Sequence, residues 1–196
     1  MNPRSLLLLI LPFLLIQGTV RASTEEAENR LKASVDKVVA VAKSAPDRKA
    51  LIAGVKPVLE NILSFDAMTR RAVGPGWRQF SPEQQKEAIR LFTTLILRTY
   101  TAKFTPGELP GVEYKTASSP APNRVEIPTT SLYKGSRYDV IYRLEETDGA
   151  PWRITDVVIE GVSMVANYRT QFDSQFKQGG ADAVIAALNR SVAESK

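Results

Sequence analysis

The stretch Trp152–Phe176, WRITDVVIEGVSMVANYRTQFDSQF, decides how the chain folds because two periodicities meet in it. Its first part, 152–159, is rich in β-branched residues and predicts a strand. Glu160 and Gly161 interrupt that run, and Ser163 is a suitable N-cap for a helix. Beyond it, apolar side chains recur at spacings of three and four residues, which is typical of an amphipathic helix. These side chains are Met164, Val165, Tyr168, Phe172 and Phe176.

Helical periodicity dominates the sequence from the N-terminus to about Phe104. Its strongest local signal is a capping box that opens a long helix, in which Ser81 is the N-cap, Pro82 is the first helical residue and Gln84 completes the box. We expect this helix to reach about Phe104. Because its apolar residues cover a wide arc, we expect it to be buried between other elements.

From residue 112 onward the period changes from helical to alternating. We predict strands at 112–116, 124–130 and 136–145, and a loop at 118–123 because that segment contains two prolines. A turn at Asp148-Gly149 would join the 136–145 strand to the Trp152 strand as a hairpin. The order of helices, antiparallel strands and further helices predicts an α+β fold, in which a curved antiparallel sheet has one face covered by helices and one face open to water.

The N-terminus has the features of a secretory leader. Arg4 precedes the apolar run 6–16, and small or aliphatic residues lead up to Ala22, after which we expect cleavage. Residues 23–196 would then form a single exported domain that begins with a helix capped by Ser23. The chain contains no cysteine, so neither a disulfide nor a lipid-modified cysteine is available.

The composition excludes several kinds of chemistry. Without His or Cys, the chain cannot build a Ser–His or Cys–His nucleophile pair, a zinc site of the usual ligands, or a haem site with either ligand. Loss of Arg4 and Arg21 with the leader would lower the formal net charge from +5 to about +3, with no basic run. We therefore expect no nucleic-acid binding, no metal and no cofactor. Much of the usual enzyme chemistry is excluded and we expect no enzyme, although acid–base chemistry with Asp, Glu, Lys, Tyr, Ser or Thr stays open.

Aromatic and methionine side chains could either fill a core or line a cavity. From periodicity alone the filled core is favoured, because the pattern reports burial and not empty space. The residues concerned are Phe65, Met68, Trp77, Phe80, Phe92, Tyr100, Phe104, Tyr142, Trp152, Met164, Tyr168, Phe172 and Phe176.

Two separated motifs resemble those of one family. The run DVVIEGVSMVANYRTQF at 156–172 is similar to the C-terminal signature of the MlaC family, the auxiliary periplasmic component of the Mla, or toluene-tolerance, lipid transport system. FDAMTRRAVGPGW at 65–77, followed by SPEQQ, is similar to the helical half of that family, and GADAVIAAL at 180–188 is similar to its end.

The resemblance implies an NTF2-like curved sheet and helices around an apolar pocket. That pocket would hold phospholipid tails, and the protein would shuttle lipid through the periplasm between an outer-membrane lipoprotein–porin complex and an inner-membrane ABC transporter, which maintains outer-membrane lipid asymmetry. A neighbouring branch accompanies hopanoid biosynthesis, and these motifs do not separate the two branches. The residues expected to contact lipid are Phe65, Trp77, Phe92, Tyr100, Val140, Tyr142, Leu144, Met164 and Tyr168.

Two alternatives stay open beside the lipid carrier. The first is a cavity enzyme with Asp156 or Asp139 as its base, although Asp156 suits a structural role as partner of Arg169 or of a backbone N–H better. The second is an envelope interaction protein with a filled core. The arginines near Trp77, which could meet a phosphate or an acidic partner but are more simply solvated or salt-bridged, are Arg70, Arg71 and Arg78.

Overall fold

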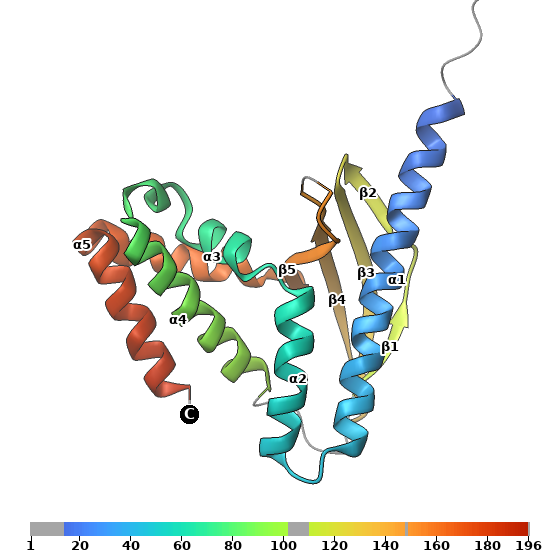
Figure 1. Cartoon of the computed structure of the whole chain (residues 1–196), viewed down its shortest axis with the longest axis horizontal. Coiled ribbons are helices and arrows are strands. Elements are labelled where there is room, and N and C mark those ends of the chain that lie inside the picture. The colour runs from blue at the N-terminus through green and yellow to red at the C-terminus, as the bar shows by residue number, and fades with distance from the viewer. Residues whose placement is uncertain (1–13, 102–109, 148, 196) are drawn as a thin grey trace, which may run out of the picture.

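The fold places helices before and after a sheet (Figure 1). The structure is a computed structural model that describes residues 14–101, 110–147 and 149–195. Its helices are α1 (Leu14–Ser44), α2 (Arg48–Ile62), α3 (Phe65–Val73), the 3-10 helix η1 (Gly74–Gln79), α4 (Pro82–Thr101) and α5 (Met164–Glu194). Its strands are β1 (Gly111–Tyr114), β2 (Ser118–Ala121), β3 (Arg124–Tyr133), β4 (Ser136–Glu145), β5 (Arg153–Ile159) and β6 (Val162–Ser163).

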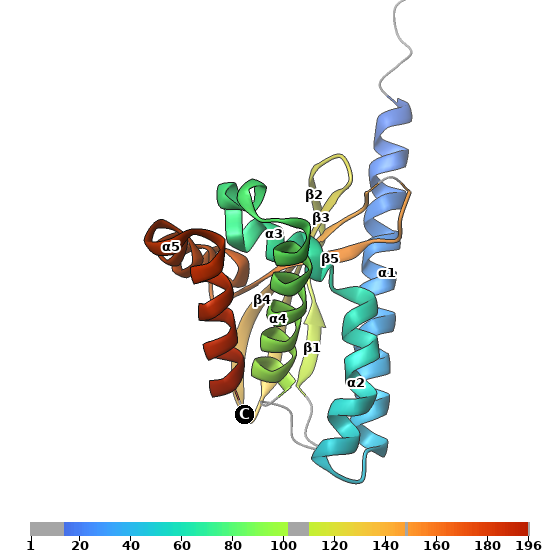
Figure 2. The ribbon, with the colours of Figure 1, turned by 60° about the vertical axis from the view of Figure 1, so that its left-hand side comes forward.

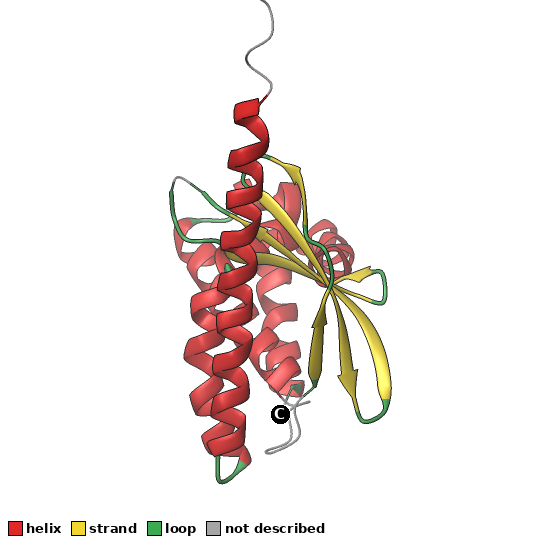
Figure 3. Ribbon diagram, turned by 90° about the vertical axis from the view of Figure 1, so that its right-hand side faces the viewer, coloured by secondary structure: helices red, strands yellow, loops and turns green. Residues whose placement is uncertain are grey.

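The strands form one antiparallel sheet in the order β1-β3-β4-β5-β6, with β2 also paired to β3. Figure 3 shows this sheet strongly twisted. The predicted α+β class and antiparallel sheet are confirmed, and β4 has the predicted bounds. The predicted loop at 118–123 is wrong in part, because 118–121 forms β2. Pro120 is tolerated there because β2 lies at an edge of the sheet, where a proline removes no ladder bond.

One face of the sheet meets the helices and the other carries charges. Val125, Ile127 and Leu144 point into the main apolar core, which they share with residues of all five α-helices. On the opposite face Arg143 Nε lies 2.8 Å from Glu126 Oε1, in an ion pair between neighbouring strands. This is the expected arrangement of one covered and one polar face.

The predicted helix caps at Ser81 and Ser163 are both formed. The Ser81 amide donates to Gln84 Oε1 at 2.8 Å and the Gln84 amide donates to Ser81 Oγ at 3.2 Å, so the capping box is formed. The Ala166 amide donates to Ser163 Oγ at 3.0 Å, which confirms the cap of α5. Gly179 and Gly180 depart from helical geometry and divide α5 in two. The expected end of α4 near Phe104 lies outside the described residues.

The N-terminal helix is longer than predicted. In the full chain α1 begins at Leu14, so Ser23 lies within the helix and is not its cap. Cleavage after Ala22 stays a prediction, and residues 1–13 are outside the described part. No helix in the described part is both long and apolar enough to cross a membrane. Figures 1 and 2 show α1 and α2 side by side as one antiparallel pair.

Candidate functional site

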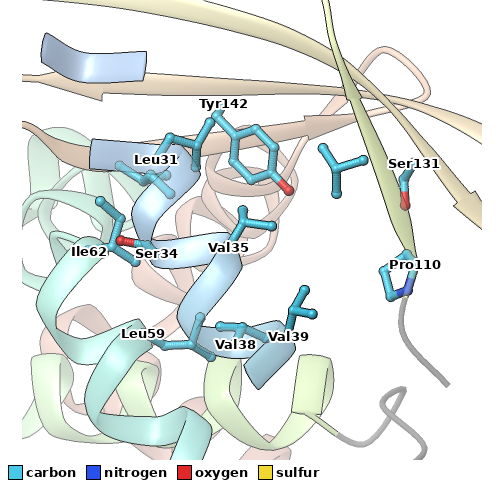
Figure 4. A pocket seen from close by; sticks show the side chains of 12 residues that line it. Leu31, Ser34, Val35, Val38, Val39, Leu59, Ile62, Pro110, Ser131 and Tyr142 are labelled. Carbon is cyan, nitrogen blue, oxygen red and sulfur yellow. The ribbon is translucent and has the colours of Figure 1, made fainter. Parts of the chain in front are cut away.

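An apolar pocket of about 160 Å³ lies between the α1–α2 pair and the sheet (Figure 4). No charged side chain lines it among the described residues. Its polar side chains are limited to two serines and one tyrosine. The lining residues are Leu31, Ser34, Val35, Val38, Val39, Leu59, Ile62, Pro110, Val112, Ser131, Tyr142 and Ile154.

One wall of the pocket is the apolar stripe of the helix pair. Leu31, Val35 and Val38 recur along α1 at helical spacing, and Leu59 and Ile62 of α2 lie on the same side. These side chains are aliphatic and of medium size, so the wall offers hydrocarbon surface without a specific hydrogen-bonding group. Such a wall suits a flexible apolar chain better than a rigid polar ligand.

The other wall is the helix-facing side of the sheet. Val112 of β1 and Ser131 of β3 are register partners, and Tyr142 of β4 is paired with Ile127 of β3. In Figure 4 the Tyr142 ring extends from the sheet into the space between α1 and β1. Burial raises the pKa of its phenol, which therefore stays protonated at neutral pH.

Hydrogen bonds fix the helix pair to the sheet at one end. Arg30 Nε donates to the Trp152 carbonyl at 2.6 Å, and its Nη2 donates to Asn61 Oδ1 at 3.0 Å. Arg153 Nη2 donates at 2.7 Å to the Leu63 carbonyl at the end of α2. The Ser64 amide adds a bond to the Ile154 carbonyl at 2.8 Å. We call this set the base of the helix pair.

The opposite end of the pair has an apolar cluster of its own. Ala42 of α1 packs there with Leu51 and Val55 of α2, apart from the main core. The two helices therefore stabilise each other near their connecting turn without help from the sheet. The pair can keep its internal packing if its distance from the sheet changes.

Among the residues expected to contact lipid, Tyr142 lines this pocket. Phe92 instead packs edge-on against Tyr168 and Phe172, with ring centroids 5.0 and 5.9 Å apart, in a filled contact between α4 and α5. Leu144 is 1% exposed in the main core. The lipid-contact assignment stays a prediction for the expected residues that lie outside the pocket, which are Phe65, Trp77, Phe92, Tyr100, Val140, Leu144, Met164 and Tyr168.

The pocket residues that sequence reasoning missed are mostly aliphatic. Leu31, Val35 and Val38 recur at helical spacing in the sequence, but such a pattern gives no reason to separate pocket residues from core residues. Val112 lies in the predicted strand 112–116 and Ser131 directly follows the predicted strand 124–130. Nothing in the sequence around either residue indicates a pocket. The predicted lipid-contact residues are mostly aromatic, and several of the aromatic ones lie in α4 and α5.

Asp156 is a structural hub and does not line the pocket. Its carboxylate accepts hydrogen bonds from Ser163 Oγ at 2.7 Å and from the Val165 amide at 3.1 Å, at the start of α5. It also accepts one from Arg143 Nη1 at 3.1 Å. The expectation of a backbone N–H partner is confirmed. The suggested partner Arg169 is wrong, because its guanidinium lies against Gly74.

The other charged candidates are paired or lie at the surface. Asp139 is exposed and accepts from Lys115 Nζ at 2.8 Å, an interaction that lowers the pKa of Asp139. Arg70 lies 3.7 Å from Asp66, and Arg71 is paired with Glu145. The described residues contain no group of His, Cys, Asp and Glu that could hold a metal ion.

Comparisons with known proteins agree with this geometry. The family model described as MlaC protein matches residues 32–190. A solved structure of the phospholipid-binding protein from Ralstonia solanacearum, in complex with a phospholipid, is similar with a TM-score of 0.79 and 26% sequence identity, and the match covers 87% of this chain and 98% of that chain. The comparison with curated proteins gave no match. Because the family model spans most of the sequence, the chain belongs to the MlaC family.

Proposed function

We propose that this protein binds phospholipid by its acyl tails in the pocket between the α1–α2 pair and the sheet, and carries lipid through the periplasm between outer- and inner-membrane complexes. The observation that carries the proposal is a pocket lined by aliphatic side chains, with no charged group among its described lining residues. The similarity to a phospholipid-binding protein supports the choice of ligand.

Hydrocarbon burial supplies the binding energy without a catalytic group. Each methylene removed from water contributes about 0.8 kcal/mol, so a long acyl chain gains on the order of 10 kcal/mol. A bilayer offers the chain nearly the same gain, so transfer between membrane and carrier is close to balanced. Direction therefore comes from the partner complexes. Neither Asp156 nor Asp139 lines the pocket, which removes support from a carboxylate base there.

The pocket must enlarge to accept a tail. Its volume of about 160 Å³ is close to that of an engineered cavity of about 150 Å³ that accommodates benzene. An acyl chain needs several times this space. The α1–α2 pair is the wall that can move, because it is fixed at its base and has a separate apolar cluster at the other end. Rotation of the pair about its base would open the pocket along its length.

Lipid extraction from the exported protein tests the proposal. Organic extraction followed by mass spectrometry is expected to find phospholipid in near-stoichiometric amount on the wild type. A hopanoid in its place would assign the protein to a related role with another lipid. Absence of any lipid, together with failure to take up phospholipid from vesicles, would refute the proposal.

A substitution that fills the pocket with a larger side chain tests whether the ligand binds there. Val35 lines the pocket from α1, so Val35→Trp is expected to reduce bound lipid several-fold because the indole occupies the space of the tail. Val58→Trp on α2 is the matched control, since Val58 is half-buried outside the pocket. Both variants need a melting temperature of the lipid-free protein. Equal lipid content in the two variants would place the ligand elsewhere.

A further inference from the structure

Two hydroxyl groups in the pocket have no hydrogen-bond partner among the residues that the structure describes. Among the described residues neither Tyr142 nor Ser131 makes a side-chain hydrogen bond, although both line the pocket. Ser34 differs, because its Oγ donates to the Arg30 carbonyl at 3.0 Å, within α1. The sheet side of an otherwise aliphatic pocket therefore presents free O–H groups.

The position of Tyr142 in the sheet directs its hydroxyl towards any ligand in the pocket. Its strand neighbours Ile127 and Val157 hold the residue from both sides by backbone pairing, and desolvation raises the pKa of its phenol. Figure 4 shows the hydroxyl oxygen directed into the pocket, away from the β4 backbone. Tyr142 is half-buried, and its hydroxyl is not among the buried unsatisfied atoms of the described residues, so it stays available to an acceptor on a ligand that enters the pocket.

We infer that the Tyr142 hydroxyl donates a hydrogen bond to the ester carbonyl of a bound acyl chain and so selects ester-linked lipids. This inference rests on the proposed function and names the chemical class of its ligand. The acceptor is neutral because the described lining contains no Lys or Arg to pair with a phosphate, and burial of an unpaired phosphate would be very unfavourable. An ester carbonyl is the uncharged acceptor that lies directly at the head of an acyl tail.

The test compares a diester phospholipid with its diether analogue, which has the same head group and chain length but no carbonyl. Delipidated protein is offered both lipids in mixed vesicles, and the bound ratio is measured by mass spectrometry. A net hydrogen bond predicts that the wild type prefers the diester by about threefold to tenfold. Tyr142→Phe keeps the ring and is expected to bring this ratio close to one.

Tyr138→Phe is the matched control. Tyr138 lies on the same face of β4 but is 41% exposed and outside the pocket, so its removal should leave the ratio unchanged. Because Tyr142→Phe preserves apolar volume, it should melt near the wild-type temperature. The ratio therefore reports the hydroxyl and not the stability of the fold.

The outcomes separate this inference from the proposed function. If the wild type binds both lipids equally, the carbonyl contact is refuted while tail binding stands. If Tyr142→Phe keeps the preference and Ser131→Ala loses it, the assignment to Tyr142 is wrong. If neither lipid binds to any form, the proposed function itself fails.

Discussion

Asp156 shows how a single side chain joins separate elements at the residue scale. It lies in β5, is 6% exposed, and satisfies the Val165 amide and the Ser163 hydroxyl at the start of α5. Arg143 of β4 supplies the compensating charge, and Glu126 shares that guanidinium. The carboxylate therefore fixes where the strand ends and the helix begins.

Replacing Asp156 with alanine should destabilise the fold by about 2–4 kcal/mol, because the buried Val165 N–H and the Arg143 guanidinium lose an acceptor. Urea unfolding followed by circular dichroism measures this change. The control is Asp139→Ala on the exposed side of the same sheet, which should unfold near the wild-type midpoint because surface ion pairs contribute little. Equal midpoints for the two variants would contradict the structural role of Asp156.

At the scale of elements, η1 is held to α5 by close contact between backbone and aromatic ring. Phe176 packs on Phe80 with ring centroids 6.2 Å apart, and Phe80 stacks on Trp77 at 5.5 Å. Gly76 lies against the same Phe176 ring, so close that an added Cβ would stand 2.9 Å from ring carbons. The glycine permits this contact because it has no side chain.

Gly76→Ala should therefore lower stability by about 1–3 kcal/mol, the usual result of overpacking. Differential scanning calorimetry of the lipid-free protein gives the change in melting temperature. Gly111→Ala serves as its control, since a Cβ there would stand 3.6 Å from Leu132, an ordinary contact. Equal melting temperatures for Gly76→Ala and Gly111→Ala would show that η1 can shift to accommodate the added Cβ without a loss of stability.

At the scale of the whole molecule, the pocket lies where the helix pair meets the sheet. Tyr142 and Tyr114 both lie at this contact. Tyr114 of β1 faces α1, where Lys32 Nζ lies 5.2 Å from its ring centroid. Burial raises the pKa of Tyr114 to about 12, with smaller contributions from Tyr142 and Asp36. The neutral phenol is thus favoured in the folded state.

This pKa predicts a loss of stability at high pH. An unfolded tyrosine ionises near pH 10, whereas folded Tyr114 keeps its proton to about pH 12. Between these values the unfolded chain binds fewer protons, so stability falls as pH rises. Melting temperatures from pH 8 to 12 should fall less steeply in Tyr114→Phe than in the wild type. Parallel curves for the two proteins would exclude a contribution from this phenol.

Much of the fold could be predicted because its signals are local. The alternation at 136–145, the capping box at Ser81 and the cap at Ser163 each depend on residues a few positions apart, and each has the predicted form. The prolines of 118–123 misled the prediction because a proline is compatible with an edge strand, and sequence alone does not show which strand lies at an edge.

The sequence by itself determined that apolar stripes exist and which face of each helix or strand is buried. Only the tertiary structure decided which stripes meet closely and which leave a space. Leu31 and Val35 share one stripe of α1 and both line the pocket, yet Leu31 is buried while Val35 is only half-buried. A pocket is a gap between elements distant in sequence, and its place depends on how far the base at Arg30 and Trp152 holds the helix pair from the sheet. The periodicity of neighbouring residues does not report the distance between the helix pair and the sheet.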